Sequence, residues 1–236
     1  GKRVSKGKAI ANFLSLGPAE QVTSILPVPK KNKEGEVFLA MITEQGVIKK
    51  TDAKQFQDVR RSGIIAIKLQ KNDHLGWVHQ VQHSEEIIIA TRKGMSIRFK
   101  EKDVRPMGRA SSGVRAIRLK TNDAVVGADI ILIVSTTEEL LVIAEMGYGK
   151  KTKVKEYKVQ NRGGGGIKTM NVTAKTGVIV SARIILPDEE DLIVVSTKGQ
   201  VIRTPLKDIS SLGRATQGVR IMKLETGDKI ASVTTL

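Results

Sequence analysis

The segment Gln160–Gly166, QNRGGGG, contains four consecutive glycines, with Arg162 before them and Lys168 just after. Glycine loses more backbone freedom on folding than any other residue, so such a run weakens a fold unless the loop requires positive φ or a ligand approaches its backbone closely. Exposed backbone N–H groups with flanking cations are suited to bind phosphate oxygens. We therefore predict that this loop binds a phosphate chain.

The glycine loop is one copy of a repeated segment. The stretches RRSGIIAIKL, GRASSGVRAIRL, NRGGGGIKTMNV and GRATQGVRIMKL align without gaps on Gly63, Gly113, Gly166 and Gly218, and a weaker copy, VSKGKAIANFL, contains Gly7 at the same position. The spacing is about fifty residues, which is within the range of propeller blades.

A second landmark recurs midway through each repeat. The segments TEQGVIKK, TRKGMSIR, AEMGYGKK and STKGQVIR each follow an apolar run and have a cation four residues after the glycine, at Lys50, Arg98, Lys151 and Arg203. The pattern predicts a β-hairpin whose second strand carries these cations, and even spacing places alternate side chains on one face.

These landmarks predict an all-β fold. Each repeat is expected to contribute a four-stranded blade, and the blades to pack into a propeller-like ring or spiral of about four to five units of roughly 50 residues. We place the repeats at about 4–58, 59–106, 107–159, 160–211 and, in part, 212–236 of one domain covering 1–236. Apolar residues make up 40% of the chain and aromatic residues 3%, so branched aliphatic side chains must build the core. Only short links such as TDAKQFQDV are expected to form a helical turn.

The charge balance favours a polyanionic partner, and nucleic acid before others. The chain has 40 Lys and Arg against 24 Asp and Glu, a net charge of +16. The sequence has no apolar run of about eighteen residues and no apolar core of a secretory signal at its start, so we expect a cytoplasmic protein that does not bind a membrane. The absence of cysteine excludes disulfides and thiolate metal sites.

The cations predicted to contact DNA lie in the glycine loops, just after them, or in the hairpins, and in a ring they would form a basic track around the rim. They are Arg60, Arg61, Arg98, Arg105, Arg109, Arg115, Arg118, Lys150, Lys151, Arg162, Lys168, Arg203, Arg214, Arg220 and Lys223, together with Gln160, Gly163, Gly164 and Gly166 of the glycine loop.

Other reactive side chains are given structural roles. His79 and His83 could share a strand face, but two nitrogen ligands rarely hold zinc, so no metal site is predicted. Trp77 is interpreted as core or blade-edge packing, since proteins that bind single strands generally use several aromatic residues. Tyr148 lacks an acid or metal cluster in its sequence context, and no nucleotide-binding loop or catalytic constellation is found. Asp103, Glu156 and Asp208 are expected to cap turns or form ion pairs.

Three of the repeated segments resemble a known family. DVRPMGRASSGVRAIRL, MGYGKKTKVKEY and DISSLGRATQGVRIMKL are similar to successive blades of the C-terminal domain of the DNA gyrase A subunit, and the similarity extends over the whole chain. The resemblance implies a β-pinwheel, in which neighbouring blades exchange strands, and a non-catalytic role in wrapping double-stranded DNA that gives gyrase its chirality for negative supercoiling. It also implies a monomeric fragment whose partners are the gyrase B subunit, together with the rest of the gyrase A subunit. ATP and Mg²⁺ are implied only for the full enzyme, and no cofactor for this domain.

That family carries a seven-residue box, QRRGGKG, on its first blade. QNRGGGG resembles the box but has Asn161 and Gly165 in place of two of its cations. Its position in the repeat order is late, so the resemblance implies a box-like loop on a later blade, with the principal box on a blade before Gly1.

Two alternatives stay open. The related C-terminal domain of topoisomerase IV has a degraded box and would bind and bend DNA without full wrapping. A propeller-like module that binds proteins is the other, although the aromatic or WD signatures of such propellers are not seen here.

Overall fold

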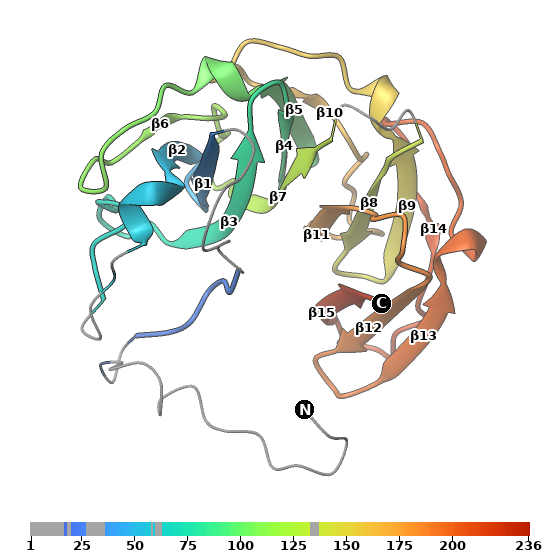
Figure 1. Cartoon of the computed structure of the whole chain (residues 1–236). Coiled ribbons are helices and arrows are strands. Elements are labelled where there is room, and N and C mark those ends of the chain that lie inside the picture. The colour runs from blue at the N-terminus through green and yellow to red at the C-terminus, as the bar shows by residue number, and fades with distance from the viewer. Residues whose placement is uncertain (1–16, 18–19, 27–35, 58, 60–62, 133–136) are drawn as a thin grey trace.

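In a computed structural model, the described residues are 17, 20–26, 36–57, 59, 63–132 and 137–236. They form four antiparallel sheets that follow one another around an arc (Figure 1). We call these sheets blades 1 to 4. The strands β3, β7, β11 and β15 lie on the inner side of the arc, and the short 3₁₀ helices lie on its outer side (Figure 1).

Each blade is given from its inner to its outer strand. Blade 1 contains β3 (Leu75–Gln82), β1 (Val37–Thr43), β2 (Val47–Asp52) and β6 (Val114–Arg115). Blade 2 contains β7 (Val125–Ile131), β4 (Glu86–Thr91), β5 (Met95–Lys100) and β10 (Ile167–Lys168). Blade 3 contains β11 (Ile179–Ile184), β8 (Glu139–Ala144), β9 (Tyr148–Lys153) and β14 (Val219–Arg220). Blade 4 contains β15 (Ile230–Thr235), β12 (Asp191–Ser196) and β13 (Val201–Pro205).

Blades 1, 2 and 3 each take strands from three successive repeats, so the expectation that one repeat forms one blade is wrong. The hairpin comes from the first of the three repeats, the inner strand from the second and the outermost strand from the third. After β4 and β5 of blade 2, the chain runs back to blade 1, where β6 pairs with β2, and only then returns to blade 2 as β7. β10 pairs with β5 and β14 with β9 in the same way. This exchange is the defining feature of a β-pinwheel, and it confirms the predicted all-β, blade-repeat architecture.

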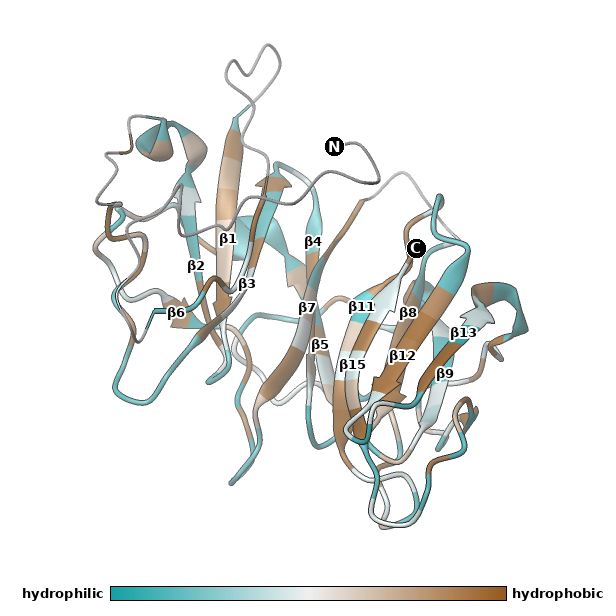
Figure 2. Cartoon of the chain, turned by 90° about the horizontal axis from the view of Figure 1, so that it is seen from below, coloured by the Kyte–Doolittle hydropathy of each residue, from teal (hydrophilic) through white to brown (hydrophobic). Residues whose placement is uncertain are grey.

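The hydrophobic core lies between the blades. Ile42 and Ile48 of blade 1 cluster with Ile89 and Ile97 of blade 2, and two further clusters join blade 2 to blade 3 and blade 3 to blade 4. Figure 2 shows hydrophobic residues in the central strands and hydrophilic residues in many connecting loops. Ile, Val and Leu dominate these clusters, because two faces of a pleated sheet pack best through branched aliphatic side chains. Trp77 packs against the first cluster, which confirms its structural role.

The turns and links also follow the sequence. In three blades a turn aspartate accepts the N–H of the residue before the hairpin glycine: Asp73 from Gln45 (3.0 Å), Asp123 from Lys93 (2.9 Å) and Asp228 from Lys198 (3.0 Å). The link after each hairpin forms a 3₁₀ helix, as expected for TDAKQFQDV. These helices are η2 (Ala53–Phe56), η3 (Glu101–Asp103), η4 (Val154–Glu156) and η5 (Leu206–Asp208). None of the helices in the described part of the chain has the length and hydrophobicity needed to cross a membrane.

Candidate nucleic-acid interface

The exchanged strands place one cation on the outer edge of each of three blades. Arg115 ends β6, Lys168 ends β10 and Arg220 ends β14, and all three residues are exposed. Two residues before each of them is a glycine with positive φ, at Gly113, Gly166 and Gly218. These cations therefore occupy equivalent positions on the outside of the arc, as the aligned repeats predicted.

The loop arginines lie next to these edge cations. The guanidinium of Arg162 donates to the backbone carbonyl of Arg115, and that of Arg214 donates to the carbonyl of Lys168 at 3.1 Å. Each arginine precedes the glycine by four residues and reaches the edge strand of the preceding repeat. The guanidinium of one repeat is consequently held at the backbone of the edge cation of the preceding repeat.

Backbone hydrogen bonds connect the same segments. The amide of Lys68 donates to the carbonyl of Ser111 (3.1 Å), Arg118 to Gly164 (2.8 Å) and Asn171 to Thr216 (2.9 Å). These six residues occupy the same two repeat positions in successive units. We call the resulting run of segments, 63–68, 108–118, 161–171 and 213–223, the perimeter belt. The glycine loop lies within this belt, between the Arg109 and Arg214 loops.

The four glycines of the loop differ in what the fold requires of them. Gly163 has φ +83° and Gly166 has φ +72°, and a Cβ on Gly166 would lie 2.5 Å from the carbonyl oxygen of Ser96. A Cβ on Gly165 would meet nothing within 4 Å, and Gly165 is exposed. Gln160 fixes the start of the loop, because its backbone N–H donates to the carbonyl of Arg98 at 2.7 Å. The fold thus explains Gly163 and Gly166 and leaves Gly165 open to an approaching ligand.

The hairpin cations form structural ion pairs. Arg98 pairs with Glu86 (2.5 Å), Lys151 with Glu139 (3.1 Å), and Arg203 with Asp191, to which its Nε donates at 2.9 Å. In each pair the acid begins the central strand of the blade and the cation stands on the adjacent strand. Arg98 also donates to the carbonyls of Val154 (2.9 Å) and Tyr157 (3.0 Å).

Blade 1 uses a different partner for the same position. Lys50 is buried, pairs with Glu101 of η3, and lies 4.7 Å above the ring centroid of Phe38. The recurrence of these cations is therefore explained by the fold. Arg203 is the most exposed of them, at 67% of its side chain, against 17% for Arg98 and 13% for Lys151.

Lys150, which the sequence predicts to contact DNA, is the predicted cation whose position departs most from that prediction. It is fully buried, and its ammonium donates to the carbonyls of Gly213 (2.6 Å) and Arg214 (2.7 Å). Its side chain does not reach the surface, so direct contact with DNA is not part of the interface that we propose below.

The remaining predicted cations lie on the belt or beside it. Arg105, Arg118 and Lys223 are exposed and Arg109 is half-buried, while Arg60 and Arg61 lie outside the described residues. Asp103 and Asp208 lie in the first turns of η3 and η5, and the carbonyl of Asp103 accepts Nε of Arg162 at 3.0 Å. Glu156 occupies the equivalent position in η4.

Sequence reasoning missed a further set of equivalent cations, one on each 3₁₀ helix. All four are exposed: Lys54, Lys102, Lys155 and Lys207. Their spacing of about fifty residues was a detectable signal. Because the 3₁₀ helices lie on the outer side of the arc (Figure 1), these lysines add positive charge on that side.

Tyr148 belongs to a cationic cluster at the edge of blade 3. Arg220 donates to its hydroxyl at 3.0 Å, and the ammonium of Lys175 lies 5.4 Å from the ring centroid. The hydrogen bond from Arg220 lowers the pKa of the Tyr148 phenol below its usual value. No pattern in the residues around Lys175 indicated that it would join this cluster.

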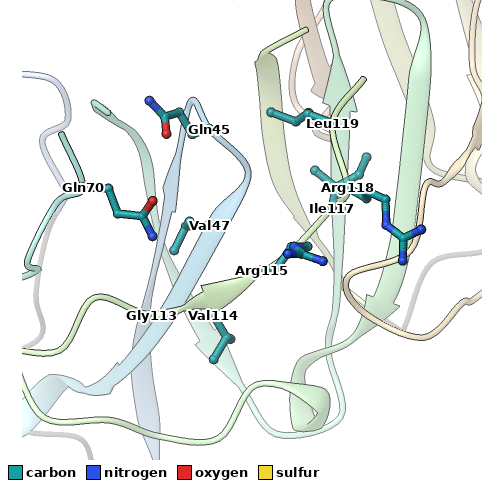
Figure 3. A pocket seen from close by; sticks show the side chains of 9 residues that line it. All are labelled: Gln45, Val47, Gln70, Gly113, Val114, Arg115, Ile117, Arg118 and Leu119. Carbon is teal, nitrogen blue, oxygen red and sulfur yellow. The ribbon is translucent and has the colours of Figure 1, made fainter. Parts of the chain in front are cut away.

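A cavity of about 520 Å³ lies beside the edge strand β6. Figure 3 shows Gln45 and Gln70 on one side of it and Arg115 and Arg118 on the other. Amide and guanidinium groups can donate hydrogen bonds to phosphate oxygens, so the cavity is suited to an anionic group at the junction of blades 1 and 2.

The histidines do not form a metal centre within the described residues. His79 contacts the carbonyl of Ala128 through Nε2 at 2.8 Å, and its Nδ1 lies 3.7 Å from Asp129. His83 lies 3.3 Å from Glu36. In that part of the chain, no group of three or more His, Asp or Glu side chains is arranged to hold a metal ion.

Comparison with known proteins agrees with this geometry. The family model described as "DNA gyrase C-terminal domain, beta-propeller" matches residues 38–81, 85–131, 138–185 and 190–236. The DNA gyrase A subunit of Staphylococcus epidermidis is 41% identical over 231 residues, and that of Lawsonia intracellularis is 36% identical over 236 residues. These matches cover 98% and 100% of this chain but 26% and 28% of the relatives, so the chain spans about a quarter of their length.

Two solved structures have the same fold. The structure of a DNA gyrase A C-terminal domain superposes with a TM-score of 0.81 at 26% identity, covering 98% of this chain and 75% of that one. The crystal structure of a topoisomerase IV C-terminal domain superposes with a TM-score of 0.88 at 23% identity, covering 98% and 70%.

Proposed function

Because this chain belongs to the DNA gyrase C-terminal domain family, we propose that it binds double-stranded DNA along the perimeter belt and bends it around the outside of the arc. The observation that carries this proposal is that the guanidinium of Arg162 donates to the backbone carbonyl of Arg115 and that of Arg214 to the carbonyl of Lys168. We infer that these contacts align the cations of successive repeats into an outer track for the DNA backbone.

The contacts that we propose are to the DNA backbone. The belt offers Arg115, Lys168 and Arg220 on edge strands, the loop arginines Arg109, Arg162 and Arg214, and the exposed backbone of Gly165. Arg105, Arg118, Lys223 and the lysines of the 3₁₀ helices extend the same surface. Cations and backbone N–H groups bind phosphate oxygens without reading bases, so the binding is expected to be largely independent of sequence.

Bending requires many such contacts. On a worm-like-chain estimate, curving about 40 bp of duplex through roughly 180° costs on the order of 10 kcal/mol. One cation pair cannot offset that cost, whereas neutralisation of about 8 phosphates along the belt can. Counterion release then gives a slope of log K against log salt near −7.

Within the full enzyme, wrapping of this kind would present one duplex segment to another with a fixed hand and so direct strand passage toward negative supercoiling. We place strand cleavage, ATP and Mg²⁺ in other parts of gyrase. The partners that we propose are the B subunit, together with the rest of the A subunit. The working location is the cytoplasm, on the nucleoid.

The direct test measures binding and topology together. Purified protein is added to linear duplex at several salt concentrations, and separately to nicked plasmid that is then ligated. We expect a salt-dependent mobility shift and a positive change in linking number. Absence of salt-dependent binding to linear duplex would reject the proposal.

One observation favours a second function, in which the domain bends DNA without wrapping it fully. This is the function that the resemblance to the topoisomerase IV domain implies. The glycine loop has Asn161 and Gly165 where the family box has cations, and two nitrogens of Arg162 are bonded to carbonyls. Binding with no change in linking number would support this second function.

A further inference from the structure

Two buried lysines lie beneath the belt at equivalent positions. The residue three after the hairpin glycine is Lys49 in blade 1 and Lys150 in blade 3, but Ile97 in blade 2 and Ile202 in blade 4. Lys49 and Lys150 are both 0% exposed. Because isoleucine occupies this strand position in blades 2 and 4, the strand can form with either residue, and the two lysines call for an explanation specific to blades 1 and 3.

The ammonium groups of both lysines donate hydrogen bonds to backbone carbonyls of the belt loops. Lys150 donates to the carbonyls of Gly213 (2.6 Å) and Arg214 (2.7 Å). Lys49 donates to the carbonyl of Arg109, the residue equivalent to Arg214, and to that of Ala66 at 2.6 Å. Both ammonium groups thus bind the backbone of the residue whose side chain belongs to the proposed DNA surface.

The glycine loop of blade 2 lacks this support. A Cβ on Gly164 would lie 3.8 Å from Cδ1 of Ile97. In blade 2 an aliphatic side chain therefore packs against the loop at the position where blades 1 and 3 have a lysine. The Arg109 and Arg214 loops are therefore held by a buried cation, and the loop between them is not.

The lowered pKa values of the two buried lysines are consistent with a structural role for their ammonium groups. Burial lowers the pKa of Lys150 to about 8, with Glu156 opposing and Arg214 adding to that shift. Burial, followed by the nearby Arg109, also lowers the pKa of Lys49. A cation in such a site is retained at a cost, which its hydrogen bonds to the loop carbonyls offset.

We propose that Lys49 and Lys150 are positioning residues, which fix the Arg109 and Arg214 loops at the orientation needed to contact DNA phosphates. The inference rests on the proposed function and deepens it. DNA is then contacted by two loops that are each bonded to a buried ammonium group and by one loop between them that is not, and the two ammonium-bonded loops set the curvature.

The test is a double-mutant cycle on DNA affinity between Lys150→Ile and Arg214→Ala in the whole chain. Isoleucine is the natural residue of blades 2 and 4, so the variant is expected to fold. Lys153→Met removes one exposed charge from the same strand and serves as the matched control. Arg214→Ala is expected to weaken binding to a linear duplex about tenfold, the lower end of the effect of one charge-assisted bond.

We expect Lys150→Ile to weaken binding to a similar extent and the double variant to be no weaker than Arg214→Ala alone. Hydrogen exchange should accelerate at residues 212–218 and stay unchanged at 161–166. Wild-type affinity at fixed ionic strength should fall from pH 7 to pH 9 by more than that of Lys150→Ile, because a neutral amine loses the charge-assisted bonds.

Each other outcome contradicts the inference in a recognisable way. Full additivity of the two losses, or unchanged affinity in Lys150→Ile where Arg214→Ala weakens binding, overturns the positioning role. No effect of Arg214→Ala overturns the proposed interface itself, and the positioning role with it. Should Lys150→Ile fail to fold, Lys49→Ile with Arg109→Ala provides the same cycle on blade 1.

Discussion

At the scale of residues, a repeated cation proves ambiguous. Arg98, Lys151 and Arg203 recur in sequence as regularly as Arg115, Lys168 and Arg220, yet the first three recur because each pairs with an acid on the neighbouring strand. The acids Glu86, Glu139 and Asp191 lie twelve residues earlier in each case. Periodicity alone identifies a repeated role and cannot say whether a ligand or the fold requires it.

The buried ammonium of Lys150 should be visible in the pH dependence of stability. Its pKa is lowered from 10.5 to about 8, so between these values the unfolded chain holds a proton that the folded chain has released. The unfolding free energy contributed by this group therefore rises as pH rises from 8 to 10.5. In urea unfolding at pH 7.5 and pH 10, we expect Lys150→Ile to lose this rise, and Lys153→Met to follow the wild type. Parallel pH profiles of wild type and Lys150→Ile would contradict the assignment.

Restoring the two missing box cations should strengthen DNA binding. Asn161→Arg with Gly165→Lys adds two cations on an exposed part of the loop, and Gly165 has open space around it. We expect tighter binding and a salt slope steeper by about 1 to 2. Ser232→Arg with Thr234→Lys adds the same charge on the inner strand β15 and is the control. An equal gain from the control would show that net charge, and not the loop, determines affinity.

At the scale of elements, the exchanged edge strand assembles the proposed binding surface from separate repeats. The apolar runs, hairpin glycines and turn aspartates were sufficient to predict the strands and their local pairing, because those interactions are local. The pairing of β6 with β2 joins segments more than sixty residues apart, and no local pattern specifies it. Strand exchange was expected only through the family resemblance, and the contact between Arg162 and Arg115 depends on it.

Substitution of two adjacent glycines tests how the edge strand β10 is held against β5. Gly166→Ala places a Cβ 2.5 Å from the Ser96 carbonyl at φ +72°, which should displace β10 from β5. We expect a loss of about 2 kcal/mol in unfolding free energy, from positive-φ strain and steric overlap. Gly165→Ala meets nothing within 4 Å and should stay within about 0.5 kcal/mol of wild type. Similar losses in both variants, measured by chemical denaturation, would contradict this account.

At the scale of the whole molecule, affinity for DNA should be spread over the perimeter. The variant Arg115→Gln, Lys168→Gln, Arg220→Gln removes one edge cation from each of three blades. We expect the salt slope to become shallower by about 3 and the change in linking number to disappear. The control replaces three exposed lysines in the turns before inner strands, Lys71, Lys120 and Lys229, by glutamine. Equal effects of the two triple variants would argue against a localised track.

The same exchange of strands determines how the molecule can be assembled. Blades 1, 2 and 3 are each completed by residues that lie beyond the start of their successor, so no uninterrupted piece of sequence encodes a finished sheet. Such pairings between distant parts of the chain are slow to form, and folding should be limited by them. An insertion or deletion at one junction would leave two neighbouring units incomplete, so in evolution the repeats would be gained or lost only together with the strand that seals the unit before.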